Sequence, residues 1–169
     1  MAKTVLPLTN ARKLAPLVLA LVIAGCGGGG GGARQASGQR VRAAGFSFEA
    51  PSGWRVTRTP TSVAARRGKA IVSVTTFRLV RRYLPALWPK VVPELDRVAQ
   101  QLAARADGTV RASATRTIAG RKARVYEIAR SGEDERIGFV LDGRREYQLY
   151  CRGAGGACDT LLGSFSLSA

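Results

Sequence analysis

Six consecutive glycines, Gly27–Gly32, divide this chain into two parts that cannot share a hydrophobic core. Glycine has no side chain to bury, and an unbroken run of it behaves as flexible coil. The polar residues that follow, 33–44, show neither helical nor strand periodicity. We therefore expect a tether over residues 26–44 and a single folded domain over residues 45–169.

The residues before the glycines have the parts of a secretory signal peptide. Lys3, Arg12 and Lys13 are the charges, and an apolar run follows over residues 14–25. Twelve helical residues rise about 18 Å, which is less than the roughly 30 Å hydrocarbon core of a bilayer, so we do not expect a permanent span. This pattern predicts a signal peptide over residues 1–25.

The apolar run ends in Ile23, Ala24, Gly25 and Cys26. This order of an aliphatic residue, two small residues and a cysteine resembles the lipobox of bacterial lipoproteins. The resemblance implies cleavage before Cys26 and a diacylglycerol, with acyl chains such as palmitate, on its sulfur. Two acyl chains would hold the protein stably on the extracytoplasmic side of a cell membrane. The alternative is an ordinary secretory signal peptide in which Cys26 has no role.

The remaining chain is strongly basic. Without residues 1–25 it has 144 residues (169 − 25) and a net charge of +13, because 24 Lys and Arg (27 − 3) outnumber 11 Asp and Glu. Such a surface attracts anionic lipid or wall polymer. No block of five like charges and no basic helix with interleaved aromatics occurs, so we expect no nucleic acid partner. Alternatively, the arginines are simply spread over a solvated surface.

The chain contains three cysteines and no histidine. The absence of imidazole excludes Ser-His-Asp and Cys-His catalysis and the zinc sites that use histidine. With Cys26 assigned to lipid, Cys151 and Cys158 are left as an even pair in an oxidising compartment. We expect them to form a disulfide, and two free thiols are the alternative.

No motif predicts a catalytic residue, a metal site or a cofactor. Glu133–Glu135 are three adjacent acids that could bind calcium. Adjacent acids in a loop are usually solvated, however, whereas calcium needs ligands that converge from several positions. Glu127 and Glu146 are the carboxylates on which a hydrolase would depend. Aromatic residues could line a ligand groove, but we favour core positions for them: Trp54, Trp88, Tyr126, Tyr147 and Tyr150.

The spacing at which apolar residues recur changes twice after residue 45, from that of strands to that of a helix and back. Strand patterns cover residues 46–49, 54–56, 62–66, 70–79, 109–118, 122–130, 136–141 and 145–151. Between residues 84 and 102, apolar residues recur every three or four positions, which predicts a helix that we start at Pro93. A short helix over residues 158–162 is capped by Gly163. Grouped strands with few helices predict an α+β fold, with helices packed on a central antiparallel sheet.

Asp142-Gly143 marks a hairpin between two of these strands. If Ile137, Phe139 and Leu141 lie on the same face as Tyr147 and Leu149, the loop must contain an odd number of residues. On that premise the loop is Asp142–Arg144.

Three segments of the domain resemble the PsbP-like fold. Residues 46–54 resemble its opening, in which two aromatics precede Pro-x-Gly-Trp. Residues 118–123 are similar to its central Gly-x-x-Ala hairpin. Residues 147–165 look like its ending, in which a cysteine closes a strand and Ser164-Phe165 follow a short helix. The resemblance implies an α/β/α sandwich, and the family includes mycobacterial lipoproteins of the LpqN type.

Members of this family that are understood act mainly by binding other proteins. We therefore expect a membrane-anchored, non-catalytic binding module of the cell envelope, whose partner is an envelope protein or an anionic polymer. One alternative is a carrier of a small apolar or lipid ligand. A carboxylate-based hydrolase is a third and weaker hypothesis.

Overall fold

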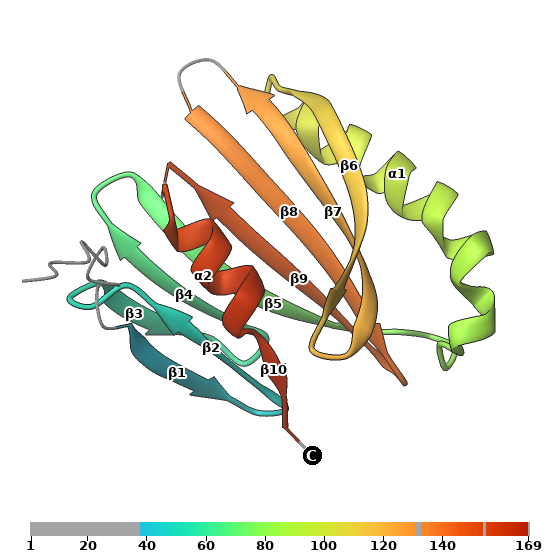
Figure 1. The fold of residues 1–169 in the computed structure, drawn as a ribbon, viewed down its shortest axis with the longest axis horizontal. Coiled ribbons are helices and arrows are strands. Elements are labelled where there is room, and N and C mark those ends of the chain that lie inside the picture. Colours follow the sequence, from blue (N-terminus) through green and yellow to red (C-terminus); the bar gives the residue numbers. More distant parts are fainter. Residues whose placement is uncertain (1–37, 131–132, 154, 169) are drawn as a thin grey trace, which may run out of the picture. The chain divides into compact units, whose positions relative to one another are not determined.

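The computed structural model describes residues 38–130, 133–153 and 155–168, and Figure 1 shows their arrangement. The predictions for the signal peptide, for Ile23–Gly25 and for Cys26 lie outside the described residues. Within them the chain forms ten strands and two α-helices. In chain order these are β1 (Gln39–Ala43), β2 (Phe46–Ala50), β3 (Arg55–Arg58), β4 (Ser62–Arg67), β5 (Ala70–Arg78), α1 (Trp88–Arg105), β6 (Thr109–Ile118), β7 (Arg121–Arg130), β8 (Glu133–Asp142), β9 (Arg145–Arg152), α2 (Ala157–Ser164) and β10 (Ser166–Leu167). A short 3₁₀ helix, η1 (Pro85–Leu87), leads into α1.

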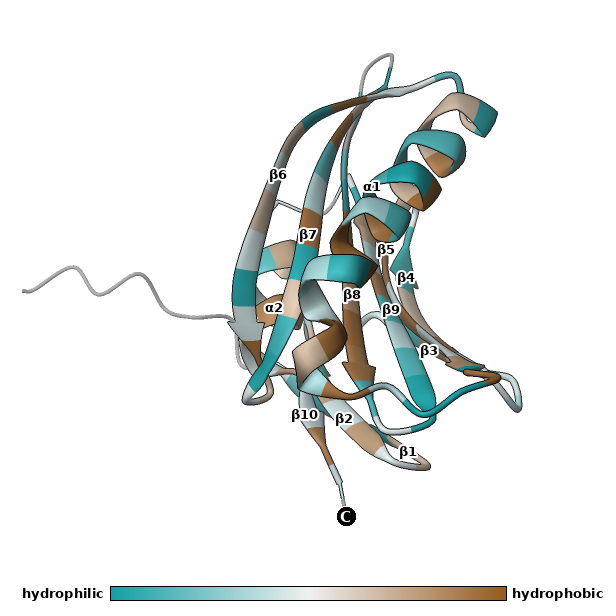
Figure 2. Ribbon diagram, turned by 90° about the vertical axis from the view of Figure 1, so that its right-hand side faces the viewer, coloured by the Kyte–Doolittle hydropathy of each residue, from teal (hydrophilic) through white to brown (hydrophobic). Residues whose placement is uncertain are grey.

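The strands form two antiparallel sheets. The large sheet has the order β3-β4-β5-β9-β8-β7-β6, and the small sheet has the order β1-β2-β10. Helix α1 packs on one face of the large sheet, whereas α2 and the small sheet cover the other face (Figure 2). This arrangement confirms the predicted α+β fold with helices packed on an antiparallel sheet.

Each face of the large sheet has its own hydrophobic cluster. On one side, the apolar stripe of α1 meets aromatic and aliphatic residues of β7 and β8, in a cluster that contains Trp88, Leu95, Ala99, Ala103, Tyr126, Ile128, Ile137 and Phe139. On the other side, the rings of Phe46, Tyr147 and Phe165 lie within 6.0 Å of one another. Fully burying a side chain of this size stabilises a fold by roughly 1.5–3 kcal/mol. Of the aromatics expected in the core, Trp54, Trp88, Tyr126 and Tyr147 are buried and Tyr150 is partly buried.

Strand β1 lies inside the segment that the sequence assigned to the tether. Its residues pair with β2, with Val41 opposite Phe48, so the folded domain begins at Gln39 and not near Gly45. Val41 is buried, while Arg40 donates hydrogen bonds to Ser47 Oγ (2.9 Å) and Ser166 Oγ (3.2 Å). A strand this short, with one buried apolar residue, has too little alternation to be recognised as a strand by its pattern.

Helix α1 begins five residues earlier than predicted (93 − 88), at Trp88, and Pro93 lies inside it. Pro89 occupies the first turn, where a proline removes no intrahelical hydrogen bond. Pro93 removes one such bond near the helix start, and the burial of Trp88 and Leu95 on either side holds both turns on the sheet. Helix α2 likewise runs past its predicted stop at Gly163. No helix in the described part of the chain has the length and apolar character that crossing a bilayer requires.

The predicted loop of the β8–β9 hairpin is wrong. Asp142 pairs with Arg145, so the loop is only Gly143-Arg144, and Val140 pairs with Tyr147. Ile137 and Phe139 therefore face α1, whereas Tyr147 and Leu149 face the opposite cluster. The prediction assumed that the apolar residues of both strands lie on the same face of the sheet. That assumption fails because these central strands are buried on both faces, so apolar residues point to either side.

The predicted disulfide is present. Cys151 at the end of β9 and Cys158 in the first turn of α2 are joined with their Cα atoms 5.6 Å apart. Both residues are buried in the cluster that α2 shares with the small sheet. The bond therefore fixes α2 to the central sheet across a glycine-rich loop.

Candidate functional site

The two carboxylates singled out for hydrolytic chemistry do not come together. Glu127 of β7 is exposed on the face that carries α2, and its Oε1 lies 3.8 Å from Arg136 Nε. Glu146 of β9 lies on the opposite face, where it pairs in register with Phe77 of β5. A carboxylate pair that acts on one bond must flank it on the same side of the sheet, so these two residues do not form such a site.

The acidic triplet is part of a strand and not of a loop. Glu133 and Glu135 belong to β8, where Glu133 Oε2 lies 3.2 Å from Arg152 Nε and Glu135 Oε1 lies 3.3 Å from Arg130 Nη1. Glu135 is only 3% exposed, so these arginines compensate a buried charge. Among the described residues no group of three or more Asp, Glu, Cys or His side chains is placed to bind a metal ion.

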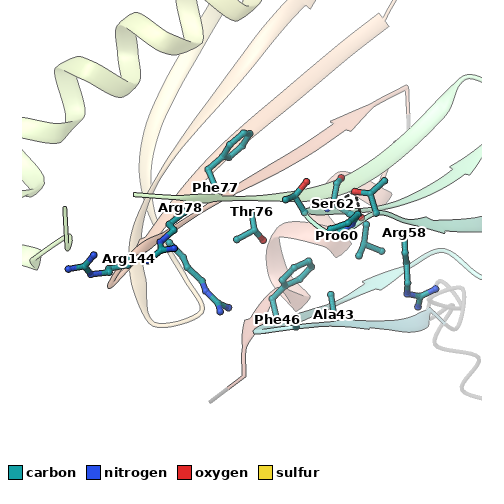
Figure 3. Close-up of a pocket in the computed structure, with 14 residues that line it drawn as sticks. Ala43, Phe46, Arg58, Pro60, Ser62, Thr76, Phe77, Arg78 and Arg144 are labelled. Carbon is teal, nitrogen blue, oxygen red and sulfur yellow. Dashed lines mark hydrogen bonds between the residues drawn. The ribbon is translucent and has the colours of Figure 1, made fainter. Parts of the chain in front are cut away.

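A cleft of about 660 Å³ opens between the two sheets, at the end where β2 begins and β5 finishes. Figure 3 shows Phe46 and Ala43 of the small sheet on one side of it, with Pro60, Ser62 and Thr76 on the other. Phe77 lies at its rim and points away to the far face of β5. Apolar side chains and hydroxyl groups thus form most of the walls.

Four arginines complete the lining, and we call this site the arginine cleft: Arg58, Arg78, Arg144 and Arg145. Arg58 ends β3, Arg78 ends β5, Arg144 lies in the turn before β9, and Arg145 begins β9. The register of β5 and β9 places Arg78 directly opposite Arg145. Like charges that face each other across two strands are destabilising, so the fold holds positive charge here at an energetic disadvantage.

Among the described residues, no carboxylate neutralises the charge of the cleft. No aspartate or glutamate is among the residues that line it. None of its four arginines forms an ion pair with another residue of the described chain. The nearest carboxylate in register, Asp142, accepts a hydrogen bond of 2.8 Å from Arg121. Guanidinium groups bind planar carboxylates and phosphates through paired N–H donors, so the cleft has the chemistry of an anion site.

The walls of the cleft are held by hydrogen bonds. The turn between β3 and β4 is closed by the Thr59 amide, which donates to Ser62 O at 2.8 Å. The Thr76 amide donates to Thr61 O at 2.7 Å and ties this turn to β5. Opposite it, Gly45 has a φ of +88°, and a Cβ there would collide with Arg145 Nη1. Residue 45, in the turn between β1 and β2, therefore has to be glycine if the Arg145 side chain is to keep its position beside this turn.

The cleft was not predicted from the sequence, because its arginines come from three separate segments. One signal was nevertheless available. No Asp or Glu occurs between Glu49 and Glu94, whereas nine Lys and Arg do. A stretch of that length without an acid predicts a positive region of the surface, although it does not show which arginines meet.

Comparisons with known proteins bear on the fold. No family model matches the chain, and no curated protein sequence matches it. The solution structure of cyanobacterial PsbP (CyanoP) from Synechocystis sp. PCC 6803 is similar with a TM-score of 0.58 at 17% identity, over 86% of this chain and 99% of that one. A crystal structure from Bacteroides thetaiotaomicron matches with a TM-score of 0.52 at 11% identity, over 78% of this chain and 49% of that one.

The crystal structure of LpqN of Mycobacterium tuberculosis, a protein involved in cell envelope biogenesis, also matches. Its TM-score is 0.43 at 13% identity, over 80% of this chain and 88% of that one. The agreement with CyanoP extends over nearly the whole of that protein and over most of this chain. The folded domain of this chain therefore has the PsbP-like fold.

Proposed function

We propose that this protein is a lipid-anchored binding module of a bacterial cell envelope, and that its arginine cleft binds an anionic group without catalysis. The observation that carries the proposal is the set of four arginines that share one cleft with no carboxylate among its lining residues. The lipobox-like residues Ile23–Gly25 and Cys26 support the anchor and the extracytoplasmic location.

The walls of the cleft suggest what kind of anion fits. Hydroxyl groups of Thr59, Thr61 and Thr76 supply donors beside the guanidinium groups, while Phe46 and Val63 form an apolar floor. A volume of about 660 Å³ lies within the range of small-molecule sites. A phosphate or carboxylate on an envelope polymer or an envelope protein would meet complementary charge here.

The anchor is tested by the intact mass of the protein recovered from the membrane fraction of cells that express the full chain. We expect the mass of residues 26–169 plus a diacylglycerol, and its loss in the Cys26→Ala variant. A water-soluble product cut at another position would contradict the anchor. That outcome would leave the cleft proposal untouched, because the cleft lies in the domain.

The cleft is tested with inorganic tripolyphosphate as the probe, by calorimetry on residues 34–169, which include every strand and helix of the fold. The double variant Arg78→Gln with Arg145→Gln should bind at least about tenfold more weakly, because it removes two charge-assisted contacts. Arg116→Gln makes a matched control, since Arg116 is exposed on β6 and does not line the cleft. Equal binding by the double variant and the control would contradict the proposal.

The apolar floor supports a second candidate function, that of a carrier for a lipid ligand. Its ligand would lie between the two sheets. Lysophosphatidylglycerol offers the same phosphate together with an acyl chain. If it binds at least tenfold more tightly than tripolyphosphate, and Phe46→Ser removes the difference, the carrier function is the better description.

A further inference from the structure

The exposed large hydrophobic side chains of the described chain are gathered in one short segment. Phe77 is 46% exposed, Val80 93%, Leu84 53% and Leu87 38%. We call residues 77–87, which comprise the end of β5 and the connection to α1 with η1, the apolar-basic segment. Scattered apolar residues on a surface are ordinary, but a group of them in one place marks a surface that another body covers.

The segment is held in place by the rest of the domain. The Leu79 amide donates to Arg144 O at 2.9 Å, and the Tyr83 amide donates to Gly143 O at 2.7 Å. The ring of Tyr83 packs against the cluster beneath α1. Leu79 and Tyr83 thus attach the segment to the β8–β9 turn, while Val80 and Leu84 between and beside them stay exposed. The exposed side chains therefore lie on an ordered surface, so binding does not carry the entropic cost of ordering the segment.

Basic residues alternate with these apolar side chains. Arg78, Arg81 and Arg82 are all exposed within the segment, and no acid occurs between Glu49 and Glu94. Figure 2 shows the mixture as teal and brown stretches along the connection that leads into the lower end of α1. The start of β7 adds Arg121 and Lys122, which line the same depression as Arg82 and Leu84. Asp142, the carboxylate in that depression, is bonded to Arg121.

We propose that this segment docks onto the surface of an anionic lipid bilayer, with Val80 and Leu84 inserted among the headgroups and the arginines paired with lipid phosphates. Segments that lie in a membrane interface combine exposed apolar side chains with arginine and lysine in this way. Protein–protein interfaces are also enriched in arginine, but here every charged residue of the segment is an arginine and no acid accompanies them, which matches a uniformly anionic surface. Each Arg near an anionic leaflet strengthens the attraction, and the aliphatic side chains add hydrophobic burial.

Docking of the segment does not depend on a lipid at Cys26, nor on the ligand of the arginine cleft. A lipid anchor would strengthen it, because only 12 residues (38 − 26) separate Cys26 from the first strand, and the chain from Cys26 to Gln39 spans at most about 45 Å when extended. The domain would then never leave the vicinity of the bilayer. In the docked state the arginine cleft, which shares Phe77 and Arg78 with the segment, lies next to the membrane surface.

The test is sedimentation of residues 34–169 with vesicles of phosphatidylcholine, alone or mixed with phosphatidylglycerol. We expect binding to the mixed vesicles and much weaker binding to the neutral ones. Val80→Asp and Leu84→Asp should each lower the partition coefficient about tenfold. The double variant Arg81→Gln with Arg82→Gln should lower it by a similar factor. Ala114→Asp, a charge-matched change on exposed β6, should leave it unchanged.

Two variants separate this proposal from the function proposed for the cleft. Val80→Asp should bind tripolyphosphate like the wild type, because Val80 does not line the cleft. Arg58→Gln should weaken tripolyphosphate binding but leave vesicle binding within about twofold, since Arg58 lies outside the segment. Docking on a bilayer is overturned if the wild type fails to bind mixed vesicles, if neutral vesicles bind equally well, or if Val80→Asp binds like Ala114→Asp.

Discussion

Tyr126 of β7 donates a hydrogen bond of 2.7 Å to Asp96 Oδ1 of α1. The same oxygen accepts a hydrogen bond of 2.9 Å from Arg124 Nε, and the Arg124 guanidinium lies 5.6 Å from the Tyr126 ring centre. These polar contacts join the helix to the sheet at the border of the cluster that holds Trp88 and Leu95. They determine where α1 sits along β7, which apolar contact alone specifies loosely.

Removal of the Tyr126 hydroxyl should weaken this attachment. Tyr126→Phe keeps the buried ring but loses a hydrogen bond to a charged acceptor, so the free energy of unfolding should fall by about 1–2 kcal/mol. Urea unfolding measures the change. Tyr83→Phe is the matched control, because no hydrogen bond of the Tyr83 side chain links it to the described residues, and it should have little effect. Equal losses in the two variants would contradict a role for the hydrogen bond.

The ionised Asp96 carboxylate should stabilise the domain at neutral pH, and this stabilisation should be lost in acid. Burial tends to raise the pKa of Asp96, but the hydrogen bonds from Tyr126 and Arg124 outweigh it and lower the pKa below 3.8. A lowered pKa in the folded state means that the stabilisation is present above about pH 4 and is lost as the pH falls through the folded-state pKa. Asp96→Asn should cost about 1 kcal/mol at pH 7, and its unfolding free energy should depend less on pH below about 4.

Glu146 should change the free energy of unfolding with pH in the opposite direction to Asp96. Burial beside β5 raises the pKa of Glu146 above 4.5, so the folded state favours the protonated form. Stability linked to this group is therefore greatest in acid and is lost as the pH rises through the folded-state pKa. Glu146→Gln should stabilise the domain at pH 7 by at most about 1 kcal/mol and have no effect at low pH. A variant that is less stable than the wild type at pH 7 would contradict this.

The Cys151–Cys158 disulfide should contribute modestly to stability, because it closes a loop with a sequence separation of only 7. The chain-entropy model predicts a loss of about 2.5 kcal/mol on reduction. The midpoint of urea unfolding, measured with and without reductant, gives the value. The double variant Cys151→Ala with Cys158→Ala should be less stable by a similar amount and insensitive to reductant.

Gly45→Ala should affect both stability and the arginine cleft. It places a side chain where φ is +88° and where a Cβ would displace Arg145 Nη1. We expect a loss of about 1–2 kcal/mol, together with weaker binding of tripolyphosphate. Gly68→Ala is the matched control, because Gly68 also has a positive φ of +58° but its Cβ would meet open space. It should lower stability without changing tripolyphosphate binding.

Much of the secondary structure was predictable because it rests on local patterns. The strand patterns in residues 122–130 and 145–151 marked β7 and β9, and the apolar stripe that contains Leu95 and Val98 marked α1. The errors occurred where local patterns are ambiguous. Pro93 looks like a helix start, but Pro89 takes that role, and β1 shows too little alternation to be recognised. In β8 both faces are apolar, so alternation could not show which residues meet α1.

By itself, the sequence determined the fold class and the pairing of Cys151 with Cys158. It also predicted a lipobox at Cys26. Periodicity and glycine runs depend only on residues that are close in the sequence, and the number of available cysteines can be counted directly. The tertiary structure alone placed Arg78 opposite Arg145 and left Val80 and Leu84 exposed. Both features follow from the pairing of β5 with β9 across more than sixty residues of chain, and no local pattern specifies the order of strands in a sheet.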